Sequence, residues 1–111
     1  MAWLKVDDGF PEHPKVQPLS DKAFRLHIAG LCSSARRLTD GHLSRMDADV
    51  CRLVANRATV KHIAELEHAG LWKPTTEGWE IKDYLDYNPS AEQVKAERER
   101  WAEQKRKKRA A

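Results

Sequence analysis

The clearest pattern of apolar and polar positions lies between residues 59 and 82. A run of apolar residues at helical spacing begins after Thr59, which suits an N-cap, and stops at Gly70, which can adopt a positive φ at a helix end. The inner side of this helix carries Val60, Ile63, Ala64 and Leu66. Two short apolar segments, 71–73 and 79–81, flank the turn PTTEG. The stretch therefore predicts a helix followed by a β-hairpin with a five-residue loop.

Two more helices are predicted before this stretch. The first starts after Ser20 as N-cap and ends before the turn signal Thr39-Asp40-Gly41. Its expected inner face is Phe24, Ile28, Leu31, Ala35 and Leu38. Ala23, Leu26 and Cys32 widen this apolar arc. A short strand over 42–44 leads into the second helix, over 47–55. That helix has one apolar face, made of Met46, Val50, Leu53 and Val54.

The two ends of the chain have different patterns. Residues 3–6 read as a short strand, and residues 83–87 read as an aromatic connector. Ser90 and Gln93 have the spacing of a capping box, which predicts the start of a fourth helix. This helix is almost wholly charged, so it has no face that could join a core. We expect it to protrude and to fray into KRKKRAA.

The order of these elements predicts an α+β, mostly helical fold, a winged helix-turn-helix with a protruding charged C-terminal helix. Only about three residues join the second and third helices, as is typical of a helix-turn-helix. Residues 1–88 would form the winged helix-turn-helix domain. Residues 89–111 would form the charged helix and the basic tail.

In such a fold the third helix is the natural reader of the DNA major groove, and PTTEG is the wing. The residues expected to face the groove are Arg57, Thr59, Lys61 and His62. Lys73 and Lys82 flank the wing and could hold phosphates. The alternative is that these residues are solvated polar side chains and that the hairpin only closes the core. Glu65 and Glu67 weigh against DNA binding, because phosphates repel carboxylates.

Charge is unevenly distributed along the 111 residues. The formal net charge is +3, but residues 91–111 hold eight Lys and Arg against four Glu, which leaves residues 1–90 at −1. The five consecutive basic residues are Lys105, Arg106, Lys107, Lys108 and Arg109. They would attract phosphates strongly. The alternative is that they only increase the solubility of the protein.

Other classes of function find little support in the sequence. Cys32 and Cys51 lie in helical patterns and are expected to be buried free thiols, and no Cys/His spacing suits a metal site. No phosphate loop or nucleophile motif is present, so we expect no enzyme, no cofactor and no small-molecule substrate. No apolar segment suits a membrane span or a signal peptide, and we expect a cytoplasmic protein.

The C-terminal helix offers a second kind of contact. Trp101 is isolated among charged residues, and Val94 lies seven residues before it on the same face. These two residues are candidates for an interface with a second copy or with a host or phage protein. The alternative function is therefore a protein-interaction adaptor on a winged-helix scaffold. The near-neutral core favours that alternative.

Three segments carry a family resemblance: WLKVDDGFPEHPKV, the LxxxGLW element ending at Trp72, and IKDYLDYNPSAEQVKAERER. Together they resemble the winged-helix N-terminal domains of phage and prophage replisome organisers and DnaD-like replication proteins, in particular small proteins of actinobacterial phages. The resemblance spans about residues 3–100. It implies double-stranded DNA binding in replication or transcription control. Such proteins continue into a domain that meets the helicase loader. Because this sequence stops at Ala111, we expect the DNA-binding half of that activity.

Overall fold

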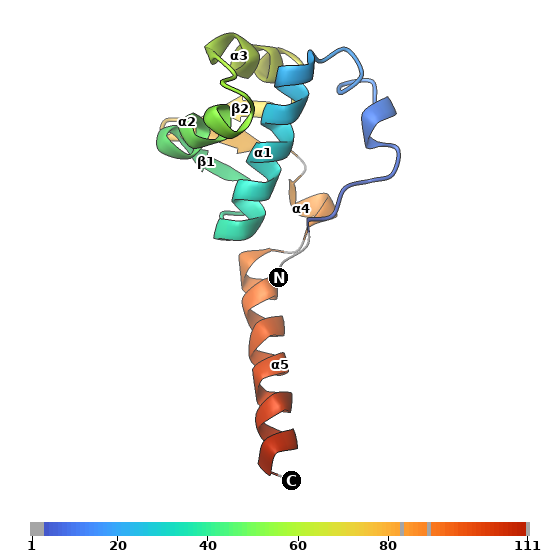
Figure 1. Cartoon of the computed structure of the whole chain (residues 1–111), viewed down its shortest axis with the longest axis vertical. Helices are drawn as coiled ribbons and strands as arrows, with labels where there is room; N and C mark the ends of the chain where they lie inside the picture. The colour runs from blue at the N-terminus through green and yellow to red at the C-terminus, as the bar shows by residue number, and fades with distance from the viewer. Residues whose placement is uncertain (1–3, 83, 89, 111) are drawn as a thin grey trace.

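A computed structural model describes residues 4–82, 84–88 and 90–110, with the backbone alone for residues 86 and 87. It has a 3₁₀ helix, η1 (Phe10–Glu12), followed by α1 (Asp21–Arg37), β1 (His42–Ser44), α2 (Arg45–Val54), α3 (Val60–His68), β2 (Trp72–Pro74), β3 (Gly78–Ile81), α4 (Tyr84–Tyr87) and α5 (Ala91–Ala110). The fold is α+β and mostly helical, as the sequence predicts (Figure 1).

The three strands form one antiparallel sheet in the order β1-β3-β2. β1 can approach β3 closely because β3 begins with Gly78, where a Cβ would overlap the carbonyl oxygen of Leu43. The β2–β3 turn is tighter than the predicted five-residue loop. Pro74 pairs with Trp79, and the Thr75 amide donates to the Gly78 carbonyl at 2.8 Å. Only residues 76 and 77 remain at the tip.

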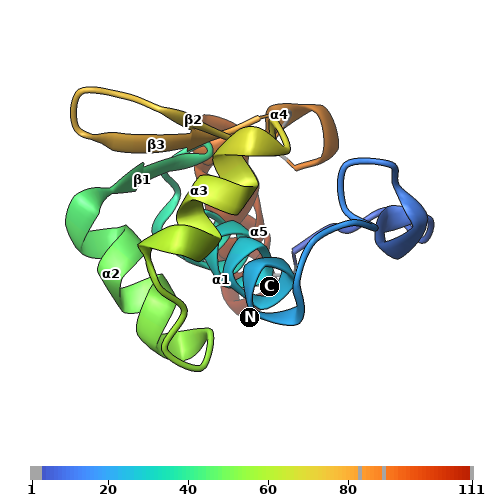
Figure 2. The same cartoon turned by 90° about the horizontal axis from the view of Figure 1, so that it is seen from above.

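The core lies between the sheet and three helices. Seen from above, the sheet forms one side of the molecule, and α1, α2 and α3 form the other (Figure 2). Trp72 of β2 is 1% exposed, and its indole lies against Gly30 of α1, where a Cβ would approach the ring to 2.7 Å. Its Nε1 donates to Nδ1 of His27 at 3.0 Å. One tryptophan thus joins the sheet to α1 by packing and by a buried hydrogen bond.

The structure corrects the predicted inner face of α1. Ser20 caps the helix as predicted, with its Oγ accepting from the Ala23 amide at 3.3 Å. The buried residues are Ala23, Leu26, His27, Gly30, Leu31, Ser33 and Ser34. Ala23, Leu26 and Leu31 are therefore buried as predicted, whereas Phe24, Ile28, Ala35 and Leu38 are only partly buried. Glycine stands at position 30 because the Trp72 ring occupies the space that a Cβ would need. Phe24 instead meets Phe10, with ring centroids 5.8 Å apart.

The apolar face of α2 does not join the core. Met46, Val50, Leu53 and Val54 are 76%, 51%, 69% and 64% exposed, and the buried residues are Asp47, Ala48 and Cys51. The cause is the helix start. Ser44 is the N-cap, its Oγ accepts from the Asp47 amide, and the Asp47 carboxylate accepts from the Ser44 amide. Asp47 also pairs with Arg37 of α1. This anchoring turns α2 so that its small side chains face the core.

The third helix follows the prediction more closely. Thr59 is the N-cap, Gly70 has φ +77°, and Ile63 and Leu66 are buried. However, Val60 is 66% exposed and Ala64 is also exposed, so two of the four residues expected inside face solvent.

Several predictions about the remaining segments need correction. Leu4 to Val6 form no strand, and Trp3 lies outside the described residues. The expected connector contains the short helix α4. Both cysteines are free, but Cys32 is exposed, whereas Cys51 is buried as expected. No helix in the described ranges is both long enough and apolar enough to cross a membrane.

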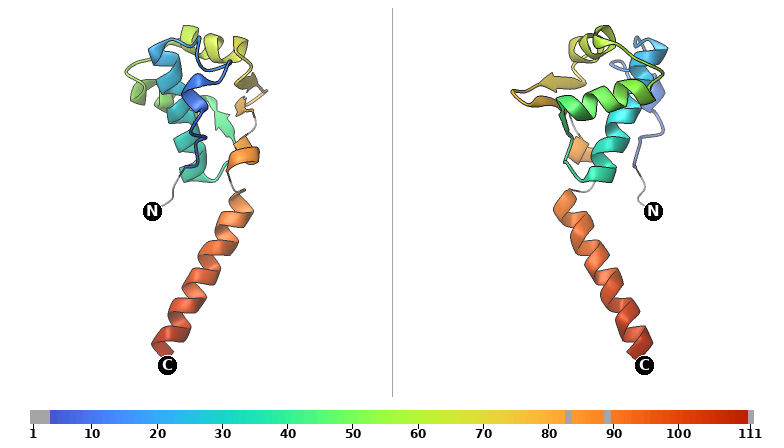
Figure 3. Two further views of the ribbon diagram at one scale, coloured as in Figure 1. Left: turned by 90° about the vertical axis from the view of Figure 1, so that its right-hand side faces the viewer. Right: turned by 60° about the vertical axis from the view of Figure 1, so that its left-hand side comes forward.

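The last helix, α5, projects from the rest of the molecule (Figures 1 and 3). It contains no buried residue, and it continues to Ala110 instead of fraying at residue 105. The predicted capping box is present, with the Ser90 amide donating to Gln93 Oε1 at 2.9 Å. The Ala91 amide donates to Asp40 Oδ1 at 2.7 Å, which fastens the start of α5 to the turn after α1. The molecule therefore measures 57 × 30 × 23 Å.

The buried histidine predicts how stability depends on pH. Burial lowers the pKa of His27 from 6.5 to about 4, so the unfolded chain binds this proton more tightly than the folded chain does. The contribution of His27 to stability is therefore complete above about pH 6.5 and is lost as the pH falls toward 4. We expect the free energy of unfolding to drop by about 2 kcal/mol between pH 7 and pH 5. Urea denaturation across this range measures the drop.

His27→Gln should flatten this part of the pH profile, since Gln keeps an acceptor for Trp72 but does not titrate in this range. His42→Gln, at an exposed position, is the matched control and should leave the profile unchanged. An equal drop in wild type and His27→Gln would contradict the assignment.

Candidate nucleic-acid interface

The helix α3 is fixed on both flanks by its own glutamates. Glu65 accepts from the amide and the Oγ of Ser20, at 2.6 and 2.8 Å. Glu67 accepts from Nε1 of Trp79 at 2.7 Å, which joins α3 to the hairpin. Both carboxylates are thereby held at the sides of the helix, against α1 and the sheet. The two residues that weighed against DNA binding in the sequence thus have structural roles.

The outward face of α3 carries no carboxylate. Its fully exposed residues are Val60, Lys61, Ala64 and His68. We call these four residues the α3 outer face. It offers one permanent positive charge, one titratable imidazole and two small apolar side chains. Val60 and Ala64 were not expected on this surface, because their apolar spacing placed them inside the core.

The structure gives Thr59 and His62 a second role. The Thr59 amide donates to Nδ1 of His62 at 2.9 Å, so the imidazole caps the first turn of α3. The His62 side chain is half-buried and is occupied in this contact. It therefore lies beside the α3 outer face and not at its centre. Thr59 is exposed at the helix start, where amides are available to an anion.

Arg57 lies in the tight turn between α2 and α3. Asn56 and Arg57 both have a left-handed backbone, with φ of 57° and 61°. This conformation costs a non-glycine residue on the order of 1 kcal/mol. It is held by the buried residues Ala55 and Ala58 on either side and by the Ala58 amide, which donates to the Arg52 carbonyl at 3.0 Å. Arg57 is exposed next to the start of α3.

The hairpin brings one predicted lysine to the surface near its turn. Lys73 is exposed on β2, two residues before Thr75. The turn itself carries Glu77, whose carbonyl accepts from the Arg45 amide at 3.2 Å and so joins the turn to the start of α2. Lys82 follows β3 and lines a cavity beside the N-terminal segment. The Lys82 amide donates to the Leu71 carbonyl at 2.9 Å, so Lys82 lies at the open end of the hairpin and Lys73 lies nearer the turn.

The predicted contacts on α5 lie far from α3. The basic run Lys105–Arg109 is exposed at the free end of α5, and α3 lies at the opposite end of the molecule (Figure 1). Trp101 is 63% exposed, and Val94 is half-buried. The structure therefore separates the α3 residues from the basic tail along the longest dimension of the molecule.

The exposed apolar residues of α2 form a surface that sequence reasoning missed. We call Met46, Val50, Leu53 and Val54 the α2 apolar face. Val50 and Val54 also border a groove against α1, lined there by Ile28, Ala29 and Cys32. A capping signal was available in the sequence, because Ser44 and Asp47 have the spacing of a capping box. That spacing moves the helix start to Arg45 and turns the apolar residues outward.

Metal binding finds no support in the part of the chain that the structure describes. It contains no group of three or more His, Cys, Asp or Glu side chains placed to hold an ion. Comparison with known protein families, with curated proteins and with solved structures finds no match for this chain. The resemblance to replisome organisers thus stays a prediction, and function has to be inferred from the geometry.

Proposed function

We propose that this protein binds double-stranded DNA without catalysing a reaction, as a winged helix-turn-helix protein that reads the major groove with α3. The observation that supports this most directly is the α3 outer face, which presents Lys61 and no carboxylate. Glu65 and Glu67 are tied to Ser20 and Trp79 beside it. Free carboxylates on this surface would be repelled by the phosphates of DNA.

The chemistry of the α3 outer face suits base edges. Lys61 can donate to guanine O6 and N7, while Val60 and Ala64 can contact a thymine methyl group. Arg57 and the amides at the start of α3 can hold phosphates on either side, and so can Thr59. His62 supports the first turn and so positions Lys61.

The order of the elements supports the winged helix-turn-helix assignment. A helix, a short strand, two helices joined by a tight turn and a hairpin follow one another, and the hairpin pairs with the first strand. The hairpin turn extends outward past α2 (Figure 3, right). Lys73 is the residue of this hairpin best placed to hold a phosphate. The resemblance to phage replisome organisers supports a cytoplasmic role in replication or in transcription control.

The α2 apolar face favours a second candidate function, self-association through α2. Arg45, Asp49 and Arg52 border this face, so it presents apolar side chains together with charges of both signs. Asp49 pairs with Arg52 of the same helix, with Oδ1 and Nη1 3.5 Å apart. In a twofold dimer both copies would use this same surface, which is self-complementary through its apolar side chains. A dimer also suits DNA binding, because helix-turn-helix dimers read two half-sites.

Replacing Lys61 tests the reader assignment. We expect Lys61→Ala to weaken binding to a selected duplex site by about tenfold, because one charged contact to a base edge is lost. Fluorescence anisotropy on the site, after selection from a randomised duplex library, measures this loss. Lys22→Ala, an exposed lysine of α1, is the matched control and should bind like wild type. Equal binding by wild type and both variants would exclude α3 as the reader.

Removing the basic tail tests its electrostatic role. A chain ending at residue 104 should bind all duplexes more weakly, and the slope of log K against log salt should become less steep by about 4 to 5, since five phosphate contacts are lost. Titrations at several salt concentrations give the slope. The preference among sequences should remain, because Lys61 is unchanged. An unaltered slope would show that the tail does not contact the nucleic acid.

The α2 apolar face predicts the oligomeric state. We expect the wild-type chain to sediment as a dimer and Leu53→Glu to sediment as a monomer, because a carboxylate at the centre of the apolar contact would be buried without a partner. Sedimentation equilibrium measures both masses. Leu85→Glu is the control, since Leu85 is also an exposed apolar residue, 54% exposed, but lies on α4. A monomeric wild-type chain would refute self-association through α2.

A further inference from the structure

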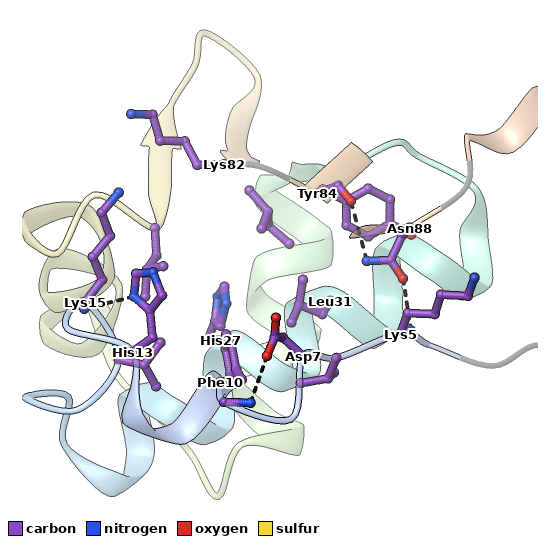
Figure 4. A pocket seen from close by; sticks show the side chains of 15 residues that line it. Lys5, Asp7, Phe10, His13, Lys15, His27, Leu31, Lys82, Tyr84 and Asn88 are labelled. Carbon is purple, nitrogen blue, oxygen red and sulfur yellow. Dashed lines mark hydrogen bonds between the residues drawn. The ribbon is translucent and has the colours of Figure 1, made fainter. Parts of the chain in front are cut away.

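A cavity of about 230 Å³ lies between the N-terminal segment, α1 and the residues that follow α3 and β3 (Figure 4). Its apolar lining is made by Phe10, Val16, Leu31, Leu71, Ile81 and Tyr84. The cavity is smaller than the 300 Å³ or more that is typical of pockets for drug-sized ligands. It therefore suits a small organic molecule. Polar groups from three separate segments also face it.

The first polar group is a fixed hydrogen-bond donor. Nδ1 of His27 accepts from Trp72 Nε1, so the proton of the neutral ring is on Nε2. Burial holds the pKa of His27 at about 4, so the ring is neutral at pH 7. The ring points toward the open centre of the cavity (Figure 4). Among the described residues no hydrogen bond takes up Nε2, although His27 is only 3% exposed.

The ring of His27 is also held in place from the side. Phe10 of η1 stacks on it, with ring centroids 5.5 Å apart and an angle of 18° between the planes. Trp72 fixes one edge and Phe10 fixes one face. A donor that is oriented before a ligand arrives loses little conformational freedom when it binds.

The remaining polar groups give the opening a positive charge. Lys15 and Lys82, from segments far apart in the sequence, lie on the same side of the cavity (Figure 4). The side chain of Lys5 points away from the centre. Asp7 is the one carboxylate among the described lining residues, and its Oδ1 accepts from the Gly9 amide at 2.8 Å. Two lysines thus lie along one edge of the cavity, against one carboxylate among the described lining residues.

From these observations we infer that the cavity binds a small monocarboxylate with an apolar body. The apolar walls hold the body, Lys15 and Lys82 attract the carboxylate, and Nε2–H of His27 donates to one of its oxygens. This ligand site is independent of the proposed DNA contacts on α3. The sequence predicted no small-molecule substrate. This cavity was not foreseen because the residues that line it are scattered along the chain, from Lys5 to Asn88.

Benzoate is a suitable probe, and benzamide is its neutral counterpart of the same shape. We expect benzoate, titrated into the ¹⁵N-labelled full chain, to move the Nε2–H resonance of His27 and to bind at least tenfold more tightly than benzamide. Inorganic phosphate should have little effect, since it lacks an apolar body. Equal binding of benzoate and benzamide, or no change at His27, would overturn the inference. So would an equal response to phosphate.

Variants of the exposed lysines separate the anion contact from the apolar contact. We expect Lys15→Gln with Lys82→Gln to weaken benzoate binding by about tenfold and to leave benzamide binding unchanged. Lys22→Gln, an exposed lysine outside the cavity, is the control and should bind benzoate like wild type. An unchanged Trp72 indole resonance would establish that the double variant is folded. Full benzoate affinity in the folded double variant would overturn the role of the lysines.

Discussion

The contact of Trp72 with α1 is the constraint on which the rest of the structure depends. The indole occupies the space that Gly30 leaves free, and its Nε1 is satisfied by His27. The ring leaves no room for a side chain at this point of α1, which explains why glycine stands at position 30. The same hydrogen bond sets the tautomer of His27. One core contact thus determines both the packing and the donor in the cavity.

The position of α3 follows from this core through hydrogen bonds at its flanks. Glu65 reaches the N-cap of α1, and Glu67 reaches the hairpin through Trp79, so α3 is tied to two elements that Trp72 already joins. The outer face of α3 is therefore presented on a rigid support. This arrangement explains how a helix with two glutamates can still offer a surface free of carboxylates.

Local signals in the sequence predicted much of the fold. The caps at Ser20, Thr59 and Ser90, the stop at Gly70 and the pairing of the two hairpin strands were correct, because each depends on neighbouring residues. The helix faces were less accurate. Apolar spacing grouped four side chains on one face of α2 but did not show which way this face turns. The anchoring of Asp47 by Ser44 and Arg37 turns it outward. Long-range contacts of this kind, like those that form the cavity, leave no periodic trace in a sequence.

The length of α5 adds a geometric consequence for nucleic-acid binding. Its start is fastened to Asp40, and its basic end lies at the far end of a molecule 57 Å long from α3. Base pairs in duplex DNA are about 3.4 Å apart along the axis, so a straight duplex in contact with both ends would span about 17 base pairs. A shorter fragment could touch only one of the two surfaces at a time. The length of the duplex thus decides whether α3 and the basic end of α5 can bind the same DNA molecule at once.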